Sequence, residues 1–173
     1  MEVMVALVVS TVGLLGLAKM ESLALSSTGV ASSRSVAAIL ASSMAAAMHA
    51  NPGFWQAGLA PAVTTVTSTA ITSSGNPYAT GVSCTVPGTT SCLPAAMAAY
   101  DLQNWQTALN SVLPAGGYLA YVNCLTGTTT GTPVTCTVVL QWAENTVAGN
   151  GQENNASAIA AAALSTYTLF VQP

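Results

Sequence analysis

The chain has 173 residues, and its two basic and five acidic residues make only 4% charged, where a soluble domain usually has about 25%. Because 51% of the residues are hydrophobic and the mean hydropathy is +0.57, it is not a charge-rich disordered polypeptide, and we expect one folded domain with at most one appended segment. Two basic residues cannot neutralise a row of phosphates, so no direct nucleic-acid binding is expected.

An uncharged apolar run, VMVALVVSTVGLLGLA, occupies residues 3–18 and is followed at once by Lys19. It is slightly shorter than the roughly 20 residues of a bilayer-spanning helix. We expect a membrane anchor or a helix that associates with other chains. A buried core helix and a secretory signal peptide are the alternatives, and the latter fits less well because Glu2 stands where basic residues should precede the run.

Residues 21–50 continue the helix, since they are rich in Ala, Leu, Met and Ser and contain no proline. They carry an apolar stripe with a spacing of four residues and two flanking members: Val36, Leu40, Met44 and Met48, beside Ala37 and Ile39. Such a stripe predicts packing against another surface. Core packing explains the methionines better than a metal or soft-ligand site, because no second set of ligands accompanies them.

Asn51, Pro52 and Gly53 end this helix, because a residue before proline is pushed out of the helical region. We therefore divide the chain into an N-terminal helix, residues 1–52, and a head domain, residues 53–173. The helix comprises an apolar anchor (3–18) and an amphipathic half (21–50).

The head begins with alternating β-favouring residues at 62–72, AVTTVTSTAIT. A second helix is predicted over 94–112, with Pro94 at an early helical position. Its proposed apolar face is Leu93, Met97, Tyr100, Trp105, Leu109 and Leu113.

Residues 118–124 and 135–142 are predicted to be strands that pair as an antiparallel hairpin. A last strand is predicted over 166–171, TYTLFV. Residues 147–157 are expected to form a loop, and 158–164 either a helix or the start of a strand.

Four cysteines lie in the head, and four cysteines allow three pairings: Cys84, Cys92, Cys124 and Cys136. We favour Cys84–Cys92, which closes a short loop containing a Pro-Gly turn, and Cys124–Cys136, which joins the two strands of the hairpin. Zinc is a weaker alternative, because structural zinc sites favour tighter spacings such as C-x2-C.

No enzyme is predicted. The single histidine, His49, lies at a helix end, where an imidazole more often caps carbonyls than performs chemistry. Nothing in the spacing of Asp101 and Glu144 supports an acid pair. A phosphate-binding glycine loop, a nucleophile elbow and a metal-spaced histidine cluster are also missing from the sequence, so no catalytic residue, cofactor or metal is expected.

The scarcity of charge also predicts tolerance of acid. Acid unfolds proteins largely by protonating carboxylates that are paired in the native state, and five carboxylates with two bases offer few such pairs. We therefore expect a head fragment from about Gly53 onward to melt at nearly the same temperature at pH 7 and near pH 3.

Several stretches resemble a known family. The opening MEVMVALVVSTVGLLGLAKME resembles the N-terminal helix of type IV pilin-like proteins, whose mature chain carries a glutamate at the fifth position within F-T-L-x-E-V, and Glu2 occupies that place. This helix is shared with type II secretion pseudopilins. The stretches MAAAMHANPGFW, CLPAAMAAYDLQNWQTALNSVLPAGG and CTVVLQWAE are similar to PilV-type minor pilins (type IV pilus modification proteins). The residues that carry this closer similarity are Tyr100, Asp101, Trp105, Leu113, Pro114 and Trp142.

The resemblance covers most of the chain and implies an α+β, pilin-like fold: a long N-terminal helix packed on a small antiparallel sheet, one extra helix and disulfides. It implies a minor structural subunit of a type IV pilus, held in the inner membrane with its head in the periplasm and then assembled into the extracellular pilus. Implied partners are major and minor pilins, a tip adhesin, and prepilin peptidase acting on the full precursor. The family's basic leader, cleavage-site glycine and first three mature residues are missing, so we expect the precursor to begin further upstream.

The resemblance also implies that Glu2 faces the terminal amine of an adjacent subunit, since a carboxylate among apolar helices needs a cation. The helix dipole alone would also favour a carboxylate there. Two other functions are kept as alternatives: a minor pseudopilin of a type II secretion system, and a tip-displayed adhesin whose Thr, Ser and Asn-rich loops bind a surface or ligand.

Overall fold

A computed structural model describes residues 2–75, 78, 84, 92–113, 117–125, 132–143 and 164–173. The chain divides into two compact units. The described part of the first unit is residues 2–34, which belong to helix α1 (Glu2–Ala50). The second unit, Ser35–Ala143 with Leu164–Pro173, contains the remainder of α1 and every other helix and strand described below.

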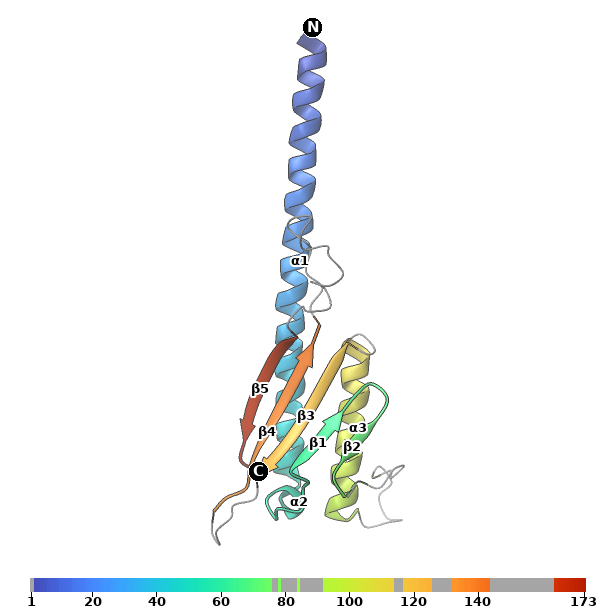
Figure 1. Ribbon diagram of the computed structural model, residues 1–173, viewed down its shortest axis with the longest axis vertical. Helices are drawn as coiled ribbons and strands as arrows, with labels where there is room; N and C mark the ends of the chain where they lie inside the picture. The colour runs from blue at the N-terminus through green and yellow to red at the C-terminus, as the bar shows by residue number, and fades with distance from the viewer. Residues whose placement is uncertain are drawn as a thin grey trace. The chain divides into compact units, whose positions relative to one another are not determined.

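The second unit is built on one antiparallel sheet with the strand order β2-β1-β3-β4-β5. The strands are β1 (Val63–Val66), β2 (Ile71–Ser73), β3 (Tyr118–Leu125), β4 (Thr135–Trp142) and β5 (Ser165–Val171). Residues 35–50 of α1 and helix α3 (Pro94–Val112) lie on the same face of the sheet (Figure 1). A long N-terminal helix, a small antiparallel sheet, an extra helix and two disulfides confirm the predicted α+β, pilin-like fold.

Most predicted elements of the head are confirmed. Helix α3 has the expected bounds, the β3–β4 hairpin extends one residue further at Leu125, and β5 begins one residue earlier at Ser165. The stretch 62–72 forms β1 and most of β2, joined by a turn in which the Thr67 N–H donates to the Ala70 oxygen at 2.9 Å. The predicted loop at 147–157 and nearly all of 158–164 lie outside the described residues.

The apolar stripe of α1 enters the core as expected, with one exception. Leu40, Met44 and Met48 expose 8% or less of their surface and pack beside Ala37 and Ala41. Ile39 is 64% exposed, because one residue advances the helix by about 100° and turns this side chain away from the stripe.

The predicted apolar face of α3 is wrong at its first turn. Leu93 is 67% exposed and Met97 is also exposed, because a row of residues spaced by four drifts by about 40° per step around the helix, so its first members have left the side that Trp105 and Leu109 bury. The positions that face the core near this end hold small residues and one leucine: Ala98, Ala99 and Leu102.

The end of α1 is fixed by contacts with the start of α3. Asn51 is buried, and its side-chain amide donates to the Pro94 carbonyl at 2.7 Å. A short helix, α2 (Pro52–Trp55), follows directly and buries both of its aromatic residues. A Cβ atom at Gly53 would approach the Pro94 ring to 3.3 Å, so the chain is closely packed at this turn.

Both predicted disulfides are present, Cys84–Cys92 and Cys124–Cys136, and no cysteine is free. The second joins residues that lie directly opposite each other in the β3–β4 register. The zinc alternative is therefore wrong, since every thiol is used in a disulfide.

Candidate assembly surface on helix α1

The first part of α1 presents apolar side chains in every direction. Val3, Leu15 and Leu25 expose 78%, 71% and 74% of their surface. The helix contains a stretch long and apolar enough to cross a membrane, and none of that stretch is buried. An exposed apolar surface of this extent marks a site for lipid or for another protein.

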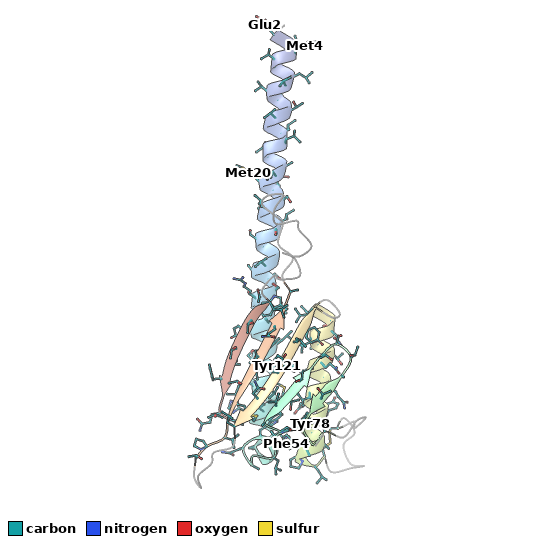
Figure 2. The ribbon with its side chains drawn as sticks, in the orientation of Figure 1. Glu2, Met4, Met20, Phe54, Tyr78 and Tyr121 are labelled. Carbon is teal, nitrogen blue, oxygen red and sulfur yellow. A yellow bond between two sulfur atoms is a disulfide. The ribbon has the colours of Figure 1, made fainter. Side chains whose placement is uncertain are left out.

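Charged groups bracket this surface. Glu2 lies in the first turn of α1, whereas Lys19 and Glu21 follow the apolar run. Figure 2 labels Glu2, Met4 and Met20 along this part of the helix. Within the described part of the chain these three charged side chains make no ion pair. The positive end of the helix dipole favours the charge of Glu2.

The second part of α1 is held in the head by a specific polar contact. The indole Nε1–H of Trp105 on α3 donates to the Leu40 carbonyl oxygen on α1 at 2.8 Å. Trp105 is only 4% exposed, so its apolar ring is removed from water and its one donor is satisfied. The motif residue Trp105 thus sets how α3 packs against α1.

The other motif residues do not form one surface site. Tyr100 is half-buried, Leu113 and Trp142 are buried, and Pro114 lies outside the described residues. Trp142 lies opposite Tyr118 in the sheet. The two buried motif residues, Leu113 and Trp142, are part of the hydrophobic core.

Asp101 is half-buried at a hollow of about 230 Å³ between α1 and α3, which Ser43, Asn104 and Trp105 also line. Burial raises the pKa of the Asp101 carboxyl above its ordinary value, because a charge is less stable where water is partly excluded. Glu144, the other carboxylate considered for an acid pair, lies outside the described residues. In the part of the chain that the structure describes, no three His, Cys, Asp or Glu side chains gather to hold a metal.

Polar contacts also hold the β1–β2 turn against α3. Gln106 donates its amide hydrogen to the Thr67 carbonyl at 2.7 Å, and Asn110 donates to the Ser68 carbonyl at 3.1 Å. Tyr118 donates to the Asn110 side-chain oxygen at 2.7 Å. The two amides lie one helical turn apart, a spacing that is visible in the sequence, whereas the carbonyls that they reach are 39 and 42 positions away and are not.

A buried hydroxyl pair is a second feature that the sequence did not reveal. The Tyr78 and Thr64 hydroxyls lie 3.0 Å apart, both in buried residues. Burial raises the Tyr78 pKa to about 12, although its hydrogen bond with Thr64 lowers it. Tyr78 also packs against Phe54, with ring centroids 5.9 Å apart (Figure 2). Tyr78 therefore connects β1 with the aromatic residues that follow α1.

Comparison of the chain with known protein families, with curated proteins and with solved structures finds no match. The architecture of the head and the exposed apolar part of α1 are therefore the observations on which a functional proposal rests.

Proposed function

We propose that the protein is a minor structural subunit of a type IV pilus, which supports pilus assembly or priming and pilus-dependent adhesion or motility. One observation carries the proposal. A single helix is apolar and exposed on all sides over its first half, yet over its second half it packs into a folded, disulfide-bonded head. Such a helix suits a subunit that exchanges lipid for the helices of neighbouring subunits.

Before assembly, the apolar part of α1 would lie in the inner membrane with the head in the periplasm. Two disulfides support an oxidising compartment for the head. Prepilin peptidase would act on the full precursor. In the pilus, α1 would contact major and minor pilins, and Glu2 would pair with the terminal amine of an adjacent subunit. An unpaired carboxylate in an apolar bundle would be costly, so this pair would favour correct docking.

Glu2→Ala tests the proposal, with Glu21→Ala as the matched control on the same helix. We expect the Glu2 variant to remain in the membrane but to be depleted from sheared pili, as measured by quantitative mass spectrometry and immunogold labelling. The Glu21 variant should be incorporated normally. Normal incorporation of the Glu2 variant would refute its role in docking, and complete absence of the wild-type protein from pili would refute the pilus assignment.

The same strains separate the alternatives. Loss of secreted enzymes with pili intact would favour a type II secretion pseudopilin. Intact pili that no longer attach to surfaces would favour a tip-displayed adhesin.

A further inference from the structure

The hollow between α1 and α3 contains the carboxylate of Asp101, which is half-buried. In the part of the chain that the structure describes, this carboxylate accepts no hydrogen bond and joins no ion pair. Neither basic residue of the chain, Lys19 or Arg34, lines the hollow. A charge that is partly removed from water and has no counter-ion destabilises the fold. A cation in the hollow would remove this cost.

The walls of the hollow are mostly apolar. Met44 on α1 and Trp105 on α3 expose only 1% and 4% of their surface, and Ala47 and Ala108 lie beside them. A calcium ion prefers a shell of about six to eight oxygen ligands, which these side chains do not supply. An organic cation on a hydrocarbon chain fits better, because its methylene groups would pack against the apolar walls.

Two further oxygen-bearing side chains line the hollow, those of Ser43 and Asn104, and both residues are exposed. The Ser43 hydroxyl donates to the Leu40 carbonyl at 2.8 Å, so its oxygen remains able to accept a hydrogen bond. An ammonium group is a compact charge with N–H donors and no acceptor. It therefore suits a site where a carboxylate and two neutral oxygens come from separate side chains.

The hollow is also small, since its volume is about 230 Å³, below the roughly 300 to 1,000 Å³ of sites that bind drug-sized ligands. We propose that it binds a single alkylammonium group, with Asp101 as the counter-ion. Two sources share this chemistry: a lysine side chain that another protein presents, and a free aliphatic amine. The inference goes beyond the proposed function and does not rest on it, because it concerns the head alone.

The pKa of Asp101 agrees with this assignment. Burial raises it above the ordinary value of a carboxyl, which means that the ionised form is the less stable one in the empty hollow. An ammonium group beside the carboxylate would favour the ionised form and lower the pKa again.

Titration of the full-length chain with n-butylammonium chloride in an uncharged detergent tests the site. The indole N–H resonance of Trp105 and the side-chain amide resonances of Asn104 report on the hollow by NMR spectroscopy. We expect both to shift saturably with the amine. They should not shift in this way with n-butanol, which has the same chain without the charge, or with sodium chloride at equal ionic strength.

Asp101→Asn keeps the shape of the side chain and removes its charge. It should weaken binding of n-butylammonium by about tenfold or more, because a hydrogen bond to a charged group is lost. Glu21→Gln is the matched control, since it removes a carboxylate that does not line the hollow, and it should bind as the wild type does. Unchanged indole resonances of Trp55 and Trp142 check that each variant is folded.

Three results would each refute the ammonium site. These are shifts that do not saturate with n-butylammonium, an equal response to n-butanol, and equal binding by Asp101→Asn and the wild type. Equal losses for the Asp101 and Glu21 variants would also refute it, because the effect would then follow the net charge of the chain and not the hollow.

Nα-acetyl-lysine methylamide distinguishes the two sources, because it carries the same ammonium chain on a peptide backbone. A dissociation constant within about tenfold of that for n-butylammonium would assign the site to a lysine side chain of another protein. Weaker binding than this would show that peptide groups do not fit at the opening, and would assign the site to a free amine. Binding of neither amine would overturn the proposal.

Discussion

The two halves of helix α1 lie in opposite environments. In the first half, Val3 and Leu15 are more than two-thirds exposed, whereas in the second half Met44 and Met48 expose 1% or less. The difference follows from how the apolar residues are arranged. A helix that is apolar on all sides needs a uniformly apolar surrounding, whereas a stripe needs one partner surface. Substitutions in the two halves should therefore affect different properties of the protein.

The largest expected effect on the folded head is that of Trp105→Ala. Removing a buried tryptophan should lower the free energy of unfolding by about 3 to 5 kcal/mol, and the Leu40 carbonyl would lose its indole donor. Thermal denaturation of the full chain in detergent measures the loss. Trp105→Phe is the control that keeps an aromatic ring and should cost less. The membrane-bound fraction should not change, and a wild-type melting temperature for Trp105→Ala would contradict the packing described.

Val12→Lys should have the converse effect. A lysine near the centre of a membrane-spanning helix costs about 2.5 to 3.5 kcal/mol, so more protein should be released from membranes by alkaline carbonate while the head melts normally. Ile39→Lys is the matched control, because Ile39 is also exposed on α1 but belongs to the half that packs into the head. Equal release of the two variants would show that the halves do not differ in membrane affinity.

Replacing both Cys124 and Cys136 by serine should lower the free energy of unfolding by about 2 to 3 kcal/mol, as expected for closure of a short loop. The separation of the pair is 12 residues, against 8 for Cys84–Cys92. The loop model therefore predicts a slightly smaller loss when Cys84–Cys92 is removed. Denaturant unfolding of the two double variants provides the comparison. A clearly larger loss for Cys84–Cys92 would contradict the ranking.

The smallest expected effect involves pH. Burial raises the native pKa of Asp101, so the folded state holds this proton more tightly than the unfolded chain. Stability associated with Asp101 is therefore fully present below its unfolded pKa and is lost as pH rises through the higher folded pKa. Asp101→Asn should raise the melting temperature at pH 7, and the gain should disappear toward pH 3. Thermal melts of the wild type and the variant at pH 7 and pH 3 measure the effect, and equal melting temperatures at pH 7 would contradict it.

The raised pKa of Asp101 agrees with the expected acid tolerance of the head. The head fragment used to measure that tolerance, however, must be longer than the one that begins at Gly53. Protonation of Asp101 favours the fold, so this carboxylate should not destabilise the head in acid. A fragment that begins at Gly53 is unsuitable, because it lacks core residues of α1 such as Leu40 and Met44. A fragment from Ser35, where the second unit begins, retains them. A fall of more than about 15 °C between pH 7 and pH 3 would contradict acid tolerance.

Local patterns predicted the elements of the head well. Pro94 marked the start of α3, residues 118–124 and 135–142 were correctly predicted to pair as a hairpin, and the short loop and the hairpin identified both disulfides. The faces of the helices were predicted less well, because hydrophobicity alone favoured large side chains. At the start of α3 the buried positions belong to Ala98 and Ala99, where small residues permit close packing, while Leu93 remains exposed.

Contacts between distant segments could not be predicted. The Trp105–Leu40 hydrogen bond joins residues 65 positions apart, and the Asn51–Pro94 bond spans 43 positions. Each depends on how the helices cross, and a periodic pattern does not contain that information. On the candidate surface, the sequence predicted the apolar run and its charged limits because these depend only on composition along one helix.

The strand order has a consequence for how the head folds. Strands β3 and β4 are neighbours in both sequence and space, whereas β1 must pair with β3 across a separation that includes all of α3. Closing the longer loop costs more chain entropy before any contact compensates for it. The β3–β4 hairpin should therefore form early, with Val138 partly packed in the folding transition state. Val66 on β1 should reach its place later, after α3 has docked.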